Sequence, residues 1–325
     1  SVKYNGYKGK QYWEGGNNVT TQRTYDIYGN VVYSQGDSSY HGGGWKDYTV
    51  TWSEIQPIIP STASITEAWL YVPYTWDETG LVPNNLTLTF NGYVLNYVNW
   101  YVDQANFGTY ANYKYGLLTF NVTGFYNKNG VNSLFIDRNG SSSIAMYPCN
   151  LMVIYEDANS TRKQIFINEE TDLLGFSPTS YGTTLDEATA YVPFTGLVID
   201  TSKVKNATFY SSAGNAGPDE GNFFWNGSLI TSNAWNGTST GIFTLVKDVT
   251  NYITSTGNIV GIQGTNSGGM VALQQVLVVE YAPDLVVTNI TANKGAGDNL
   301  FANEPNNITI TITNQGASNS PESTL

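Results

Sequence analysis

Two stretches that are far apart in the chain decide the fold: "LMVIYED" at residues 151–157 and "LVVEYAP" at residues 277–283. Each begins as a short, almost continuously apolar run in which β-branched residues are frequent, which favours a strand. A strand without polar alternation is covered on both faces, so each run predicts a strand in the centre of a sheet. Tyr155 and Tyr281 take the same place in the two runs, which suggests that the chain contains two related halves.

Other motifs recur in the same order along the two halves. Phe90-Asn91-Gly92 matches Trp225-Asn226-Gly227, the run from Gly116 matches the run from Gly241, and Tyr71-Val72-Pro73 matches Tyr191-Val192-Pro193. A constant order with drifting spacing is expected when strands are kept and loops change length. Because proline cannot donate to a β-ladder, the last pair predicts that each half begins with a strand at a sheet edge or strand start.

The fold class that follows is all-β: two tandem related antiparallel β-sandwich modules, of jelly-roll or immunoglobulin-like type, and a partial C-terminal immunoglobulin-like module. We predict N-terminal edge strands plus the first module in 1–157, a connecting strand and loop in 158–184, the second module in 185–282, and the partial module in 283–325. Two or three strands cannot close a sandwich, so we expect either that another element completes the last segment or that the chain has been cut.

Composition excludes several classes of function. Lys and Arg number 14 against 26 Asp and Glu, and the net charge of −12 opposes binding to nucleic acid. The single cysteine, Cys149, and the single histidine, His41, exclude an internal disulfide framework and a multi-histidine metal site. The sequence contains no run of 18 apolar residues, so no membrane insertion of this chain is expected. A start at Ser1 without Met favours a mature or trimmed chain.

The order of motifs supports a family resemblance. The motifs are YVPYTW at 71–76, Phe90-Asn91-Gly92, Asn121-Val122-Thr123, LMVIYED, INEETDLLG at 167–175, and ATAYVPF at 188–194 through LVVEYAP. Over roughly residues 20 to 282 the chain resembles an uncharacterised domain family of methanogen and other archaeal surface proteins. The tail from Pro283, "PDLVVTNI", resembles the opening of a CARDB module, a cell-adhesion-related, immunoglobulin-like domain. The resemblance implies export, an extracellular cell-surface location and glycosylation, and it implies no catalytic residues.

Asn-X-Ser/Thr acceptors are frequent, although the abundance of Asn, Ser and Thr accounts for most of them. The candidates for glycosylation are Asn18, Asn85, Asn121, Asn139, Asn159, Asn206, Asn226, Asn236, Asn289 and Asn307.

Two acidic segments are candidates for calcium, because loops of Asp, Glu and Asn oxygens suit a hard cation. They are "NEETD", with Glu169, Glu170 and Asp172, and "AGPDEGN", with Asp219 and Glu220. The alternative is a solvated acidic loop, and neither segment has the spacing of a known calcium loop. No cofactor is required.

The sequence does not predict an enzyme. Asp37, His41 and Asp47 lie near one another, but the chain lacks a GxSxG nucleophile turn. Adjacent acids in a strand point to opposite faces, which does not suit the paired carboxylates of glycoside hydrolysis.

Aromatic residues are dense in "YVNWYVDQANFGTYANYKY", where Trp100, Tyr101, Tyr110 and Tyr113 are candidates for contact with another subunit. Internal packing and stacking on sugar rings are the alternatives. In the tail, Val286, Ile308, Ile310 and Ile312 are expected to insert into a neighbouring subunit by strand addition.

The leading hypothesis is an extracellular structural protein of an archaeal envelope, N-glycosylated and self-assembling into a surface layer, sheath or filament. Its partners would be copies of itself and covalent glycans. The alternative is a carbohydrate-binding or adhesive surface module, and the third hypothesis is an enzyme that acts on polysaccharide.

Overall fold

The computed structural model describes residues 2–6, 18–104, 113–176, 183–265, 269–292, 300, 302 and 305–319. Within them the only helical elements are α1 (Ile55–Ile58) and a short 3₁₀ turn at Thr123–Phe125. The remaining elements are strands, which confirms the all-β prediction.

The first half of the chain forms a sandwich of two sheets. Its larger sheet has the order β2 (Thr21–Ser34), β11 (Asn150–Glu156), β4 (Ser64–Asp77), β8 (Lys114–Asn121), and is extended by β7 (Asn99–Gln104) and β1 (Val2–Gly6). β10 (Ala145–Met146) pairs with the end of β4. The smaller sheet has the order β3 (Asp47–Trp52), β9 (Asn132–Arg138), β5 (Leu86–Phe90), β6 (Tyr93–Val94).

The second half forms a sandwich with the same plan. Its larger sheet has the order β12 (Arg162–Leu174), β19 (Met270–Tyr281), β14 (Val204–Gly214), β17 (Ile242–Asp248). Its smaller sheet has the order β13 (Thr189–Pro193), β18 (Ile259–Gln263), β15 (Asn222–Trp225), β16 (Ser228–Thr231).

Strand order identifies both sandwiches as jelly rolls. With β1, β7 and β10 set aside, the described residues of each half form eight strands. The first, eighth, third and sixth form one sheet, and the second, seventh, fourth and fifth form the other. This is the double Greek key of the jelly roll. The apolar runs at 151–157 and 277–283 lie in β11 and β19, and each of these strands is hydrogen-bonded to a neighbour on both sides, as predicted.

The repeated Tyr-Val-Pro is the one matched motif that does not mark equivalent strands. In the first half it lies in β4, and in the second half it lies in β13, whose counterpart is β3. Pro193 is in an edge strand, as predicted, but the prediction is wrong for Pro73, because β4 lies between β8 and β11. Pairing with β11 ends at Tyr71, so the missing N–H of Pro73 breaks no ladder bond on that side. The Asn-Gly turns, in contrast, both join the fourth strand to the fifth.

Strand β2 joins the two large sheets into one hydrogen-bonded sheet. Its residues 29–34 pair with β11, and its residues 21–28 pair with β12. The switch occurs at Gly29, where a Cβ atom would lie 1.9 Å from the carbonyl oxygen of Tyr155. β2 is therefore an interior strand and not one of the N-terminal edge strands that the sequence predicted in 1–157. The predicted connecting segment 158–184 contains β12, which is hydrogen-bonded on both sides.

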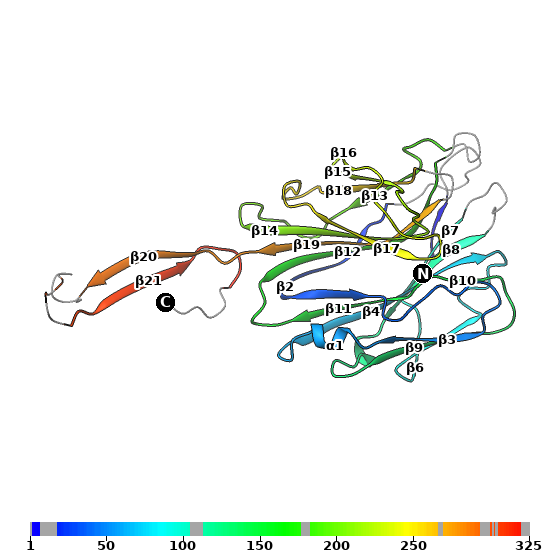
Figure 1. Cartoon of the computed structure of the whole chain (residues 1–325), viewed down its shortest axis with the longest axis horizontal. Helices are drawn as coiled ribbons and strands as arrows, with labels where there is room; N and C mark the ends of the chain where they lie inside the picture. The colour runs from blue at the N-terminus through cyan, green and yellow to red at the C-terminus, as the bar shows by residue number, and fades with distance from the viewer. Residues whose placement is uncertain are drawn as a thin grey trace.

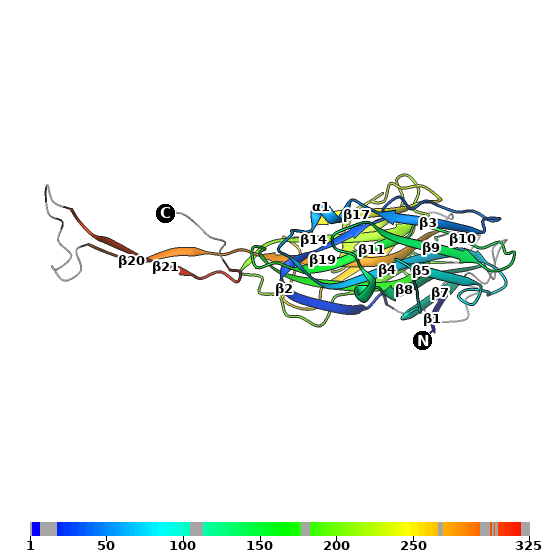
Figure 2. The same ribbon diagram turned by 90° about the horizontal axis from the view of Figure 1, so that it is seen from below.

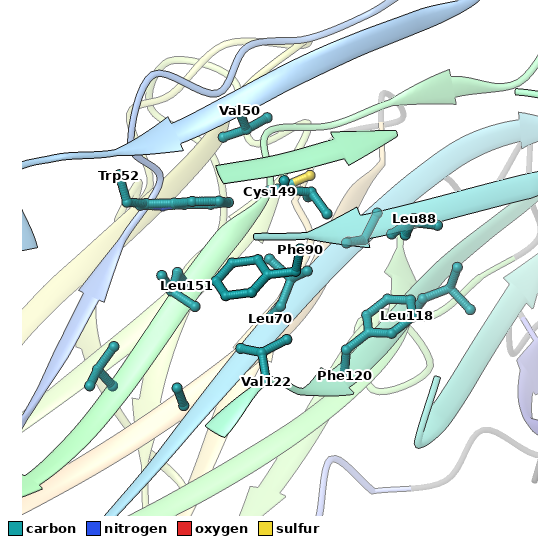
Figure 3. Packing of buried hydrophobic residues seen from close by; sticks show 14 of the residues in the cluster. Val50, Trp52, Leu70, Leu88, Phe90, Leu118, Phe120, Val122, Cys149 and Leu151 are labelled. Carbon is teal, nitrogen blue, oxygen red and sulfur yellow. The ribbon is translucent and has the colours of Figure 1, made fainter. Parts of the chain in front are cut away.

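The joined sheet turns back on itself, so that the two large sheets face each other and the molecule has four layers (Figure 1). Two apolar cores lie inside the two sandwiches, and a third lies between the large sheets. Figure 3 shows the first, in which Trp52 of β3 and Phe90 of β5 pack toward Leu151 of β11. Burying such a side chain stabilises the fold by about 1.5–3 kcal/mol relative to leaving it exposed to water. The sum of these contributions holds the layers together.

The C-terminal ribbon consists of β20 (Leu285–Ala292) and β21 (Ile308–Asn314), paired antiparallel. It extends from the end of β19 away from the body of the molecule (Figures 1 and 2). Neither face of the ribbon therefore lies against the jelly rolls.

Candidate assembly surface

The C-terminal ribbon has one apolar face and one polar face. Directly opposite residues in an antiparallel pair share a face, and a β-bulge between Val287 and Asn289 keeps the pattern in phase. The apolar face carries the cross-strand pairs Val287–Ile312, Ile290–Ile310 and Ala292–Ile308. The polar face carries Val286, Asn289, Thr291, Thr309, Thr311 and Thr313.

The apolar face is open to solvent. Ile290 is 64% exposed, Ile308 59% and Ile310 43%. Of the residues predicted to insert into a neighbouring subunit, the structure places Ile308, Ile310 and Ile312 on one apolar face, whereas Val286 lies on the opposite, threonine-rich face. Within the described residues β20 and β21 pair with each other alone, so their outer edges have no strand partner there.

The base of the ribbon is fixed to the second jelly roll. The backbone N–H of Arg162 donates to Ser318 Oγ (2.8 Å), and the Arg162 guanidinium donates to the Ala317 carbonyl (3.2 Å). The same guanidinium holds Asp26 through two bonds of 2.7 Å and lies over the Tyr281 ring. Ser318 is buried, so the ribbon leaves the body from a defined point.

A buried polar network lies between the two large sheets, among the residues of the third apolar core. Arg23 of β2 donates to Glu169 of β12 (2.6 Å) and to the hydroxyl of Tyr71 (2.6 Å). The Tyr101 hydroxyl donates to Glu169 (3.0 Å), and the guanidinium lies 3.8 Å from the centre of the Trp69 ring. Although burial opposes its charge, the pKa of Arg23 is raised because Tyr71 and Glu169 stabilise the cation. These contacts tie the two jelly rolls together.

Further along β12, buried carboxylates from both halves approach one another. Asp103 of β7 accepts N–H bonds from Leu173 (2.7 Å) and Gln104 (2.7 Å). Burial, with a further contribution from Asp172, raises the pKa of Asp103 well above its usual range. The Asp103 carboxyl is therefore held toward its neutral form.

The predicted calcium residues do not form a calcium loop. Glu169, Glu170 and Asp172 are buried in β12, a strand rather than a loop, and Glu169 is paired with Arg23. Asp219 is exposed in a turn, while Glu220 is buried and accepts the Gly217 N–H (2.7 Å). Among the residues that the structure describes, no three His, Cys, Asp or Glu side chains gather closely enough to hold a metal ion.

Three of the four aromatic candidates for a subunit contact pack inside the chain. Tyr101 is fully buried, so it is not available to a neighbouring subunit, and Trp100 is partly buried and donates to the Tyr74 hydroxyl (2.8 Å). Tyr113 packs edge-on against Trp76. Internal packing, one of the alternatives left open by the sequence, describes these three residues, and Tyr110 lies outside the described residues.

The predicted glycosylation sites differ in exposure. Asn85 is buried, so a folded chain has no room for a glycan there. Asn206 is half-buried and donates its side-chain amide to Glu280 (2.9 Å). The exposed candidates are Asn18, Asn121, Asn139, Asn159, Asn226, Asn236, Asn289 and Asn307.

The remaining reactive side chains have structural partners. Asp37 accepts both the N–H and the hydroxyl of Thr51, and the His41 ring stacks on Tyr48 with centroids 3.7 Å apart. Cys149 is buried in the first core, and burial raises the pKa of its thiol to about 12. None of the helices in the described part of the chain is long and apolar enough to cross a membrane.

Comparison with known proteins identifies a family. The model of the family described as "Protein of unknown function (DUF3344)" matches residues 6–280, and the chain therefore belongs to that family. No curated protein matches.

Among solved structures, the similarities are weak. A putative β-galactosidase from Bacteroides fragilis shares 8% identity at a TM-score of 0.21, covering 78% of this chain and 35% of that one. The pilus backbone of Streptococcus pneumoniae shares 9% identity at a TM-score of 0.21, and the match covers 96% of this chain and 57% of that one. An α-L-rhamnosidase from Aspergillus terreus shares 12% identity at a TM-score of 0.20, and the match covers 78% of this chain and 38% of that one. The chain thus spans between about a third and somewhat over half of the length of these proteins.

Proposed function

We propose that this member of the DUF3344 family is an extracellular structural protein of an archaeal cell envelope that assembles from copies of itself. In this proposal the apolar face of the C-terminal ribbon packs on a neighbouring copy, and the repeated contact builds a surface layer, sheath or filament. Exposed sequons carry N-linked glycans, and assembly needs no cofactor.

The observation that carries the proposal is the open apolar face of the ribbon. A lone two-stranded ribbon is marginal in water, and exposed apolar surface of this kind marks an interaction site. The pairs Val287–Ile312 and Ile290–Ile310 present branched side chains that a partner would bury.

A second copy is favoured as the partner by the distribution of charge. The whole chain carries a net charge of −12, so two copies repel each other over most of their surfaces. The paired strands 285–292 and 308–314 contain no charged residue. The ribbon is therefore an element that approaches another copy with little electrostatic cost.

The experiment compares two neighbouring substitutions on opposite faces of β21. Ile310→Lys places a charge on the apolar face, and Thr311→Lys places the same charge on the polar face. We expect Ile310→Lys to abolish high-molecular-weight assemblies in light scattering and electron microscopy, and Thr311→Lys to assemble as the wild type does. A chain that ends after Tyr281 should fold and remain monomeric.

Equal assembly by both lysine variants, or polymerisation of the shortened chain, would contradict the proposal. Since both side chains lie on the ribbon, far from the jelly-roll cores, the unfolding transition of the body should be the same in the two variants. That comparison separates a loss of assembly from a loss of folding.

A further inference from the structure

The outer face of the smaller sheet in the second half has a groove, lined by Tyr191, Phe224, Gly261 and their neighbours. Tyr191 of β13, Gly261 of β18 and Phe224 of β15 are directly opposite one another across three strands. Gly261 thus forms the floor, with an aromatic residue on each side. The volume of the groove is about 610 Å³, which is within the range of small-molecule sites.

The spacing of the two aromatic residues fits a ring between them. Neighbouring strands lie about 4.8 Å apart, so a group above Gly261 is about that distance from each flanking strand, within stacking range of both rings. Any side chain at 261 would occupy this space. Its Cβ would already lie 3.2 Å from the Phe224 Cβ.

The backbone does not require glycine at position 261. Its φ is outside the left-handed region, and glycine in the interior of a strand is destabilising relative to alanine. A glycine there often marks the close approach of another group. In this chain Gly261 is buried at the bottom of the groove, and the Thr189 methyl group and the Phe224 ring lie 3.5 and 3.6 Å from the place that its Cβ would take. The groove lies above it, between Tyr191 and Phe224.

The first half provides an internal comparison. By register and strand order, the row equivalent to Tyr191–Gly261–Phe224 is Thr49–Phe135–Thr89. There the central position carries a phenylalanine and the flanks carry threonine, so the pattern is reversed. The same scaffold therefore forms with the central position filled, and the row with a central glycine occurs in the second half.

The chemistry of the lining indicates the class of ligand. The walls are aromatic, whereas the ends are bordered by Thr189 and Gln263 on one side and by Asn226 on the other. Among the residues that line the groove, Asp186 is the one with a charge, and it accepts a hydrogen bond from the Tyr191 hydroxyl. A ligand with apolar faces and a rim of neutral hydroxyl groups complements these surfaces, and an anionic one would be repelled.

We propose that this groove binds a neutral pyranose of a glycan, stacked between Tyr191 and Phe224 above Gly261. The site is on a different part of the molecule from the C-terminal ribbon, so it does not depend on self-assembly.

The test is a titration of the full chain, made without glycans because Asn226 borders the groove. Glucose, galactose, mannose and N-acetylglucosamine are added in turn, and amide shifts are followed by transverse-relaxation-optimised NMR. We expect at least one sugar to shift the Gly261 amide with millimolar affinity. Tyr191→Thr and Phe224→Thr, which copy the first half, should each weaken binding about tenfold.

Phe135→Thr is the matched control, since it removes an exposed aromatic residue from the first half and should leave the affinity unchanged. Absence of any shift at Gly261 with all four sugars would overturn the proposal. So would affinities that are unaffected by both threonine substitutions, or binding of free indole in preference to every sugar. Spectra that match the wild type away from the groove establish that the variants are folded.

Discussion

The guanidinium of Arg23 and the carboxylate of Glu169 lie 2.6 Å apart between the two large sheets, and the Glu169 side chain is fully buried. The two residues belong to different jelly rolls: Arg23 is in the part of β2 that pairs with β12, and Glu169 is in β12 itself. Removing water from a charge is costly, so each of these groups depends on the other. The pair therefore makes the contact between the halves specific.

Glu169→Gln should destabilise the protein strongly, because it leaves the Arg23 cation buried without its counter-charge. Loss of one partner of a buried pair costs about 3–5 kcal/mol. Chemical denaturation of the variant should show this loss in the free energy of unfolding. Glu78→Gln, at an exposed position, is the control and should change it by less than about 0.5 kcal/mol. A similar small effect of Glu169→Gln would mean that Arg23 is solvated in solution.

Gly29→Ala should also be destabilising, for a steric reason. The added methyl group would lie 1.9 Å from the Tyr155 carbonyl oxygen, where β2 leaves one sheet for the other. Backbone atoms must move to relieve this overlap, and we expect a loss of about 3 kcal/mol or more and a lower Tm.

Gly124→Ala is the matched control, since its new Cβ meets nothing within 4 Å. If the two alanine variants melt at the same temperature, the crossing of β2 is not as tight in solution as the structure has it.

Part of this architecture could be predicted from the sequence. The apolar runs at 151–157 and 277–283 indicated central strands, and the Asn-Gly turns marked equivalent hairpins, because both signals are local. The Tyr-Val-Pro echo failed because a tripeptide does not determine which sheet its strand joins. The sheet that a strand joins is determined by the order of the strands along the chain and by their pairing, and Pro73 and Pro193 are in non-equivalent strands.

The acidic stretch at 167–175 shows a limit of a different kind. The sequence indicates a loop of calcium ligands at Glu169, Glu170 and Asp172, but the three acids are buried in a strand. Acids are rarely buried, and here Arg23, far away in the sequence, makes burial of Glu169 possible. The groove of the second half could have been found: Gly261 interrupts an apolar strand, and that interruption is visible in "IVGIQ".

The buried Asp103 should give the protein a specific dependence on pH. A carboxyl group whose pKa is raised in the folded state binds protons more tightly there than in the unfolded chain. Its contribution to stability is complete below the unfolded value of about 3.9, and it is lost as the pH rises through the folded value. Asp103→Asn removes this ionisation, although an amide can accept only one of the two N–H bonds.

The free energy of unfolding of Asp103→Asn, measured relative to that of the wild type, should therefore rise between about pH 4 and pH 8. This rise is expected whether the variant is more or less stable than the wild type at pH 4. Urea denaturation of both proteins across this range measures the difference. If it is independent of pH, Asp103 ionises in the folded protein as easily as in the unfolded chain.

Ser318→Ala should loosen the ribbon without affecting the jelly rolls. Ser318 Oγ accepts the Arg162 N–H at 2.8 Å, and loss of this bond at a buried position costs about 1 kcal/mol. The cost appears locally, because the ribbon contributes no residue of β20 or β21 to the three apolar cores. Amide hydrogen exchange in 285–292 and 308–314 should then become about fivefold faster, while exchange in β11 and β19 stays unchanged. Ser232→Ala, at an exposed position just after β16 that belongs to no glycosylation sequon, is the control and should alter neither region. Faster exchange throughout the chain in Ser318→Ala would show that the ribbon base supports the whole fold rather than the ribbon alone.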